Sequence, residues 1–177
     1  LQTKGIYATL TALGGILIYV AFRFRFTFAV GAIVAAFHDI LITITMLAFF
    51  HYDITLNIIA ALLTITGYSV NDTIVVFDRV RENQRLMRRE PLDVIVNKSV
   101  NQTLGRTAIT SGVTLLAVLA LYLFGGEVLR GFAFTMIVGV ITGTYSTVFI
   151  AAAIAIILSR RGPTSTAVPP QARLKRA

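Results

Sequence analysis

The sequence contains no cysteine, and charged side chains are scarce among its 177 residues. Without cysteine, disulfide bonds and thiolate metal sites are excluded. Charged residues make up 14% of the chain and hydrophobic residues 56%, whereas soluble domains carry about 25% charged residues. G-x-S-x-G, H-E-x-x-H and phosphate-loop motifs are also missing, so we predict no enzyme, no metal site and no bound cofactor. These shortages argue against a water-soluble fold.

Charge is missing most completely from four long stretches. Uncharged runs of 18, 18, 20 and 29 residues follow Lys4, Asp53, Arg106 and Arg130 in turn. A helix needs about 20 apolar residues to cross a bilayer. A fifth stretch is equally apolar except for the adjacent residues His38 and Asp39. We therefore predict an all-α membrane protein with five transmembrane helices, at residues 5–22, 26–49, 54–77, 103–124 and 132–158.

The basic residues gather on alternate connections between these spans. Of the 16 Lys and Arg residues, 14 lie on one predicted side of the membrane, and only Lys4 and Arg130 lie on the other. An excess of Lys and Arg marks the cytoplasmic face, so the C-terminus is predicted to be cytoplasmic. Topology thus accounts for the basic charge without a nucleic-acid partner. Residues 160–177, which are basic and contain Pro, Ser and Thr, are predicted to form a disordered tail after a membrane domain at 1–159.

One long connection, at residues 78–102, lies on the predicted cytoplasmic side. Its charged first part continues the preceding helix, and Pro91 favours a new helix start because its missing N–H is harmless there. Apolar residues then recur at helical spacing opposite polar ones. Residues 91–102 are therefore predicted to form an amphipathic helix at the membrane surface.

Small and hydroxylated residues line one face of each of the last two spans. Threonines recur in the fourth span at positions 103, 107, 110 and 114. In the fifth span Gly139 and Gly143 form a G-x-x-x-G motif, and in the third Gly67 opens space for a neighbour. Such residues let membrane helices approach closely and form hydrogen bonds. A packing role alone is the simpler interpretation of most of them.

Four strongly ionisable side chains lie within the spans: His38, Asp39, Asp72 and Arg106. Such groups are costly in hydrocarbon, and a functional role with a partner is their default interpretation. Counting the helical rise from the flanking charges places Asp72 about 10 Å and Arg106 about 12 Å below the same membrane surface. The matched depths predict an ion pair between them. Alternatively, Arg106 extends to the headgroups, or the pair is permanent and only fixes helix packing.

Asp72 is too short to reach the headgroups, and polar residues surround it at helical spacing. Low dielectric favours its protonated form and a nearby guanidinium its charged form, so moving either group would change its protonation. This is the requirement for a proton-coupled switch. His38 beside Asp39, with Asn71 and Thr110, forms a possible further part of a proton path.

Three segments carry a resemblance to a known family: ALLTITGYSVNDTIVVFDRVREN at 61–83, NQTLGRTAITS at 101–111 and GVITGTYSTVFI at 139–150. They resemble SecF, the membrane subunit of the bacterial SecDF protein-export complex. The resemblance implies a resistance-nodulation-division fold, in which six helices pair with six helices of SecD in the bacterial inner membrane. It also implies proton-driven assistance to preproteins leaving the SecYEG channel, with protons as the coupling ion. The family's proton-path aspartate and arginine fall on Asp72 and Arg106.

The resemblance departs from the family at the front of the chain. The family has one more span and a folded outer domain before Gly5, and the chain begins at Leu1 rather than Met. We therefore expect a fragment or processed piece, or one part of a fused SecDF chain. Half of a related exporter of lipids or small molecules is the alternative function, and a scaffold that only assembles a translocon is another. An intramembrane protease does not fit, because only Asp72 lies in a motif and no second motif aspartate is present to form a catalytic pair.

Overall fold

The computed structural model describes residues 7, 11, 14–16, 18–20, 22–24 and 26–160, and every regular element in that part of the chain is a helix. Four of these helices are long and apolar enough to cross a membrane: Phe26–Phe49, Leu56–Leu86, Leu92–Phe124 and Gly126–Ser159. They agree with four of the five predicted spans. Of the remaining predicted span, 5–22, the structure describes residues 7, 11, 14–16, 18–20 and 22, and of the predicted tail, 160–177, it describes residue 160 alone, so both predictions fall partly or almost wholly outside the described residues. The described part is therefore a multi-pass helical membrane domain.

Helices α2 (Phe26–Phe49) and α3 (Leu56–Leu86) form a tight hairpin. At its turn the backbone N–H of Tyr52 donates to the carbonyl of Leu47 at 2.9 Å, and His51 has a φ of 57°. Thr55 then caps α3, because its hydroxyl accepts a hydrogen bond from the N–H of Ile58. The short connection holds the two helices side by side.

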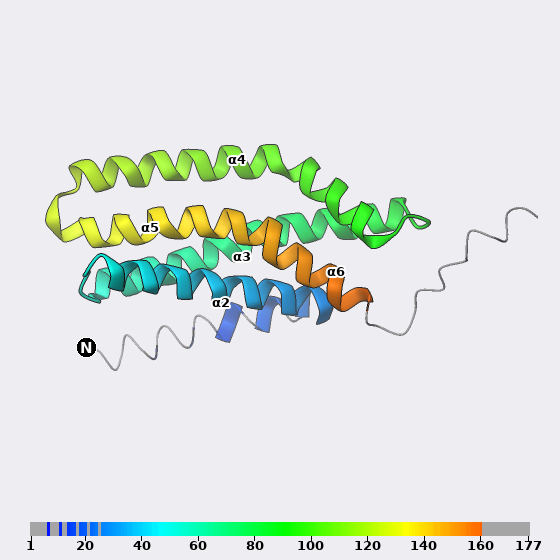
Figure 1. Ribbon diagram of the computed structural model, residues 1–177, viewed down its shortest axis with the longest axis horizontal. Coiled ribbons are helices and arrows are strands. Elements are labelled where there is room, and N and C mark those ends of the chain that lie inside the picture. The colour runs from blue at the N-terminus through cyan, green and yellow to red at the C-terminus, as the bar shows by residue number, and fades with distance from the viewer. Residues whose placement is uncertain are drawn as a thin grey trace, which may run out of the picture.

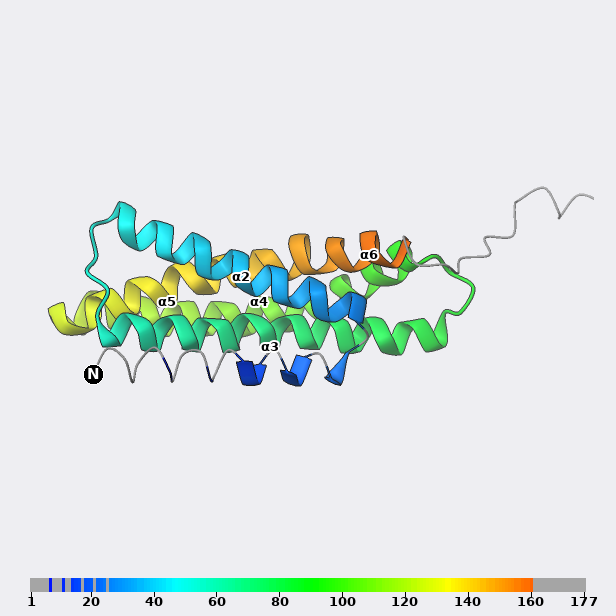
Figure 2. The ribbon, with the colours of Figure 1, turned by 90° about the horizontal axis from the view of Figure 1, so that it is seen from below.

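Helix α3 has 31 residues and is about 46 Å long at 1.5 Å per residue. That length exceeds the roughly 30 Å of a bilayer core, and the last turns of α3 carry the charged residues. Figure 2 shows α3 extending along the bundle and past the N-terminal end of α2. The charged end of α3 therefore lies where the headgroups and the water beyond them begin.

Helix α4 (Leu92–Phe124) includes residues 92–102 of the predicted amphipathic segment in the same continuous helix as the fourth span. Pro91 is the residue before the first helical turn, and the helix then continues without interruption through the fourth span. The apolar face of its first turns contributes Ile95 and Val96 to the core shared with α3. The amphipathic pattern is therefore present, with its apolar face packed against the protein and its polar face exposed, and its place at the membrane surface stays a prediction.

Helix α5 (Gly126–Ser146) follows α4 after a turn that only glycine fits. A Cβ at Gly125 would overlap the carbonyl oxygen of Leu121, and Gly126 has a φ of 74°. Helix α5 packs against α2, α3 and α4 and is thus the central helix of the described bundle. Figure 1 shows it between α4 on one side and α2 with α3 on the other.

The last predicted span is not a uniform α-helix. A π-helical turn, η1 (Thr147–Ala151), separates α5 from α6 (Ala152–Arg160). The axis of α6 departs from that of α5 at this point (Figure 1). Such turns contain one residue more than an α-helical turn and are frequent at functional sites.

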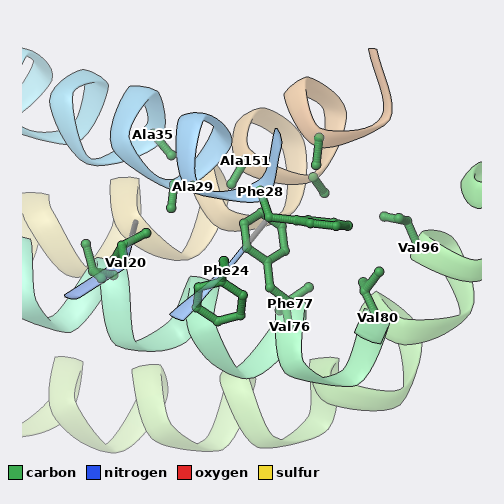
Figure 3. Packing of buried hydrophobic residues seen from close by; sticks show 14 of the residues in the cluster. Val20, Phe24, Phe28, Ala29, Ala35, Val76, Phe77, Val80, Val96 and Ala151 are labelled. Atoms are coloured by element: carbon green, nitrogen blue, oxygen red, sulfur yellow. The ribbon is translucent and has the colours of Figure 1, made fainter. Parts of the chain in front are cut away.

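The larger hydrophobic core lies where α2 begins and α3 leaves the span. Figure 3 shows residues from α2, α3, α4 and η1 meeting there, with Phe24, Phe28 and Phe77 grouped together. The ring centroids of Phe28 and Phe77 are 5.0 Å apart in an edge-to-face arrangement. A smaller cluster, which includes Ala61 and Met136, joins α3, α4 and α5 nearer the opposite end. Between the two clusters the helices meet mainly through small and polar residues.

Three glycines mark close helix contacts. A Cβ at Gly139 would overlap the Ile65 side chain, and one at Gly143 would lie 3.1 Å from Ser69. A Cβ at Gly31 would lie 2.7 Å from the backbone oxygen of Ala151. Gly67, which the sequence suggested as a packing residue, has nothing among the described residues within 4 Å of a Cβ. The α3–α5 contact therefore depends on glycines of α5.

We expect Gly139→Ala to lower the free energy of unfolding by about 1–3 kcal/mol, because the added methyl group overlaps the buried Ile65. Gly67→Ala is the matched control and should be neutral or stabilise the helix by about 0.5–1 kcal/mol. Thermal unfolding of both variants in detergent measures the difference. Equal stability of the two variants would contradict the close α3–α5 packing.

Candidate functional site

Helix α3 carries two neighbouring polar stripes at the middle of the bundle. Ser69 and Thr73 are one helical turn apart and buried, and their hydroxyls meet groups on α2 and on the α5–η1 segment. Tyr68 and Asp72, also one turn apart, make their hydrogen bonds to α4. Residues four apart lie on one face of a helix, so each stripe faces its own neighbours.

Asp39 is the most completely buried ionisable residue of the site, with an exposed fraction of 0%. Its Oδ2 accepts hydrogen bonds from the hydroxyls of Ser69, at 2.5 Å, and Ser146, at 2.7 Å. Its Oδ1 lies 3.2 Å from Nδ1 of the half-buried His38. One carboxylate thus joins α2, α3 and the end of α5.

The Asp39 contact lies directly beside the π-helical turn. Ser146 is the last residue of α5, and the next residue, Thr147, lies in η1 with its hydroxyl 2.9 Å from that of Thr73. Helix α2 approaches the other end of the same turn where Gly31 meets Ala151. The π-helical turn is therefore held at its beginning by polar contacts and at its end by close backbone packing.

Asp72 is half-buried and less completely bonded. Its Oδ1 accepts a 2.7 Å hydrogen bond from the hydroxyl of Thr107 on α4. Its Oδ2 is buried and has no hydrogen-bond partner in the described part of the chain. One turn earlier, Tyr68 donates to Ser111 at 3.1 Å, and Ser111 lies 2.8 Å from the Thr144 hydroxyl. Asp72 therefore has one anchored oxygen and one open oxygen.

Arg106 does not form the predicted direct ion pair with Asp72 in this structure. No oxygen of Asp72 lies within 4.0 Å of the guanidinium, although the two charges are close enough to interact electrostatically. The Arg106 side chain is exposed, and the neighbouring Thr107 contacts the carboxylate instead. Asp72 does lie at the same depth as residues 106 and 107 of α4, as the helical rise predicted. At that depth, however, it is Thr107 and not Arg106 that faces α3.

The other residues proposed for the proton path divide into two groups. His38 and Asp39 lie together, with Asp39 in the interior. Asn71 and Thr110 are exposed on the described bundle, and the Thr110 hydroxyl donates to the carbonyl of Arg106 on its own helix at 2.9 Å. Neither residue therefore belongs to the hydrogen-bonded group formed by Asp39, His38, Ser69 and Ser146.

The hydroxyl donors are site residues that the sequence pattern alone does not predict. Ser69, Ser146 and Thr107 bind the two carboxylates. A signal was present, since Thr107 belongs to the threonine face of the fourth span. Hydroxyls at helical spacing indicate a packing face equally well, however, and only the structure shows which of them meet a carboxylate.

The site is suited to holding protons. Among the residues that the structure describes, no group of three His, Asp or Glu side chains could hold a metal ion. Carboxylates with hydroxyl donors can gain or lose a proton while keeping their hydrogen bonds. Intramembrane ionisable residues of this kind mark ion pathways and proton relays. The geometry therefore defines a helical membrane protein with two carboxylate centres on adjoining helices.

Comparison with known proteins identifies the family. Residues 1–161 match the family described as "Protein export membrane protein SecD/SecF, C-terminal". The chain belongs to this family, and its relatives place it on the SecF side.

A protein translocase subunit SecF from Koribacter versatilis is 52% identical to the chain over 171 residues, which cover 96% of this chain and 42% of the relative. The SecF subunit of Escherichia coli O157:H7 is 49% identical over 91% of this chain and 50% of its own length. A subunit named SecDF from Thermus thermophilus is 48% identical over 91% of this chain and 22% of its own length. The chain thus spans about half the length of these SecF relatives or less.

Solved structures share the fold. A crystal structure of SecDF from Thermus, described as a translocon-associated membrane protein, has a TM-score of 0.85 and 49% identity, over 89% of this chain and 22% of that chain. A second SecDF crystal structure, in a form called super-membrane-facing, has a TM-score of 0.80 and 50% identity, over 84% of this chain and 20% of that chain.

We expect Ser69→Ala and Ser146→Ala each to lower the free energy of unfolding by about 0.6–1.7 kcal/mol, the range of hydrogen bonds between membrane helices. The control is Thr45→Ala on α2, since the exposed Thr45 hydroxyl bonds the Leu41 carbonyl of its own helix. Denaturant titration in detergent gives the three values. A cost of Ser146→Ala no larger than that of Thr45→Ala would contradict a structural role for the Asp39 contact.

Proposed function

We propose that the chain is the SecF membrane domain of a SecDF complex that uses the proton-motive force to assist preprotein export through SecYEG. In this proposal the protein lies in the bacterial inner membrane with its C-terminus in the cytoplasm. SecD, on a separate or the same chain, is its direct partner. Protons are the coupling ion, and the polypeptide is moved without covalent chemistry.

The observation that carries the proposal is the Asp72 carboxylate, in which one oxygen has a hydrogen-bond donor and the other has none among the described residues. It lies in the Asn71-Asp72-Thr73 motif at membrane depth, with Oδ1 held by Thr107 and the buried Oδ2 open. An ionised carboxylate in hydrocarbon costs about 2.5–3.5 kcal/mol or more unless a proton or a cation neutralises it. A carboxylate with one oxygen held by Thr107 and the other without a partner can bind a proton at one time and a cation at another.

Arg106 is the cation that would alternate with a proton as the partner of Asp72. Its position next to Thr107 means that a rotation of α4 would carry the guanidinium toward the oxygen that Thr107 now holds. An Asp72 paired with Arg106 favours the charged form, and an Asp72 released from it favours the protonated form. A cycle between these two arrangements would couple proton movement to helix movement.

Exposure on the described bundle supports a partner beside α4. Helix α4 is the least buried of the four candidate spans. Its exposed surface includes Arg106 and Thr110, and the nearby surface of α3 includes Asn71 and Gly67. An exposed arginine and asparagine at membrane depth are unfavourable against lipid. Coverage by the helices of SecD would remove that cost and would give Gly67 a neighbour.

Asp72→Asn tests the proposal, because Asn keeps the size and most hydrogen bonds of Asp but does not titrate. One proton crossing 100 mV provides about 2.3 kcal/mol, which is about 40-fold in an equilibrium constant. We expect the variant complex to assemble normally and to lose the stimulation of export by the gradient. Export of a preprotein by membrane vesicles, with and without an uncoupler, measures this stimulation.

Glu82→Gln on the same helix is the control, since the exposed Glu82 pairs with Arg79, at 2.6 Å, beyond the span. It should retain gradient-stimulated export. Normal stimulation in the Asp72→Asn complex, at an unchanged protein level, would make Asp72 a structural residue and would overturn the proposal.

Arg106→Met separates a moving partner from a permanent bridge. Breaking a permanent buried pair costs about 3–5 kcal/mol, whereas loss of an exposed, unpaired side chain costs less than about 0.5 kcal/mol. Because Arg106 is exposed in this structure, we expect a nearly unchanged free energy of unfolding together with a loss of gradient-driven export. Arg106→Lys should also impair export, since lysine keeps the charge but lacks the planar fork. A loss of 3–5 kcal/mol in Arg106→Met would instead show a static bridge.

A further inference from the structure

A cavity of about 680 Å³ opens at the end of the bundle where α2 begins, α3 ends and α4 begins. This volume lies within the usual range of small-molecule sites. On α3 the lining begins at Phe77, more than one helical turn beyond Asp72, and none of the lining residues belongs to the two carboxylate centres. The cavity is therefore separate from the proposed proton site.

The floor of the cavity is aromatic and apolar. Phe24, Phe28 and Phe77 line it near the start of α2 and on α3, and Ile95 lines it from α4. The same rings form part of the larger core (Figure 3). Phe77 is also the last residue of the predicted third span, so the floor lies near the boundary of the hydrocarbon.

The rim of the cavity is basic. Arg81, Arg85 and Arg88 all line it: Arg81 and Arg85 lie one turn apart on one face of α3, and Arg88 lies in the turn that follows the helix. Along the axis of α3, Arg81 lies about 6 Å and Arg85 about 12 Å beyond Phe77. The cavity thus changes from apolar to cationic over the depth at which a phospholipid changes from acyl chain to headgroup.

The charge of these arginines is not neutralised within the described bundle. Arg23, a fourth arginine of the lining, is paired with Asp78 at 2.8 Å. By contrast, Arg81, Arg85 and Arg88 have no ion pair with any described residue. Among the described residues, Glu90 is the one acidic member of the lining. The open part of the cavity is therefore strongly positive.

Charge and shape together select the occupant. The chain's own segment at 161–177 carries only basic side-chain charges, so it does not complement the rim. Free phosphate would bind the arginines but would leave the aromatic floor unfilled. Guanidinium groups bind phosphate through paired hydrogen bonds, and basic pockets between membrane helices bind anionic headgroups.

We propose that this cavity binds an anionic phospholipid from the adjacent leaflet. The phosphate contacts Arg81, Arg85 and Arg88, and the glycerol and first acyl carbons cover Phe28 and Phe77. The lipid fills the space between the start of α2 and the charged end of α3.

The proposal is tested by native mass spectrometry of the full complex in detergent, titrated with phosphatidylglycerol, phosphatidylethanolamine or inorganic phosphate. We expect at least roughly tenfold preference for phosphatidylglycerol over phosphatidylethanolamine. Each arginine near a membrane surface contributes about fivefold to the binding of anionic lipid, so Arg81→Gln with Arg85→Gln should weaken phosphatidylglycerol binding about 25-fold.

The matched control is Arg89→Gln with Lys98→Gln, which removes two exposed cations that line a neighbouring cavity and not this one. It should bind phosphatidylglycerol within about twofold of the unchanged protein. Equal binding of the two lipids would overturn the proposal, as would equal losses in both double variants. Full displacement of the lipid by millimolar phosphate would also overturn it and would indicate a phosphate site.

Discussion

A carboxylate inside a bilayer must obtain its hydrogen-bond donors from the protein, because the hydrocarbon offers none. The two acidic residues at the centre of this bundle meet that requirement to different extents. Asp39 receives hydroxyls from two other helices and has His38 beside it, whereas Asp72 receives one hydroxyl and keeps one buried oxygen open among the described residues. The hydrogen bonds of Asp39 hold three helices together, whereas the second oxygen of Asp72 is available to another partner.

Helix α3 connects the two centres. Ser69 and Thr73, which contact α2 and the α5–η1 segment, lie on either side of Asp72, which contacts α4. A movement of α4 that changes the partner of Asp72 therefore acts on a helix that is anchored on its other side. In the proposed cycle, the hydrogen bonds and close glycine contacts on that other side of α3 would pass the movement on to α2 and α5.

The spans could be placed from the sequence because charge is so costly in hydrocarbon that an apolar run of helical length without any charge is typical of a membrane crossing. The same cost singled out Asp39, Asp72 and Arg106, and the helical rise gave the level at which α3 and α4 meet. Helical rise does not give rotation about the axis, so it could not distinguish Arg106 from Thr107 as the residue that faces Asp72. Nor could a glycine pattern distinguish Gly139, which contacts Ile65, from Gly67, which has no such neighbour among the described residues.

The π-helical turn has a consequence for helical phase. Buried residues of the last span recur every four positions, at 135, 139, 143, 147, 151 and 155. Four residues of an α-helix turn through about 400°, so in a regular helix each residue of this row would be rotated by about 40° about the axis relative to the one before. The row would then leave the buried side of the helix before it reached α6. The extra residue of η1 resets the phase midway, which lets Gly139 face α3 and Ala155 still reach the core. Removing one residue from η1 would rotate all of α6 by about 100° and turn Ala155 outward, although no buried side chain of α6 had been changed.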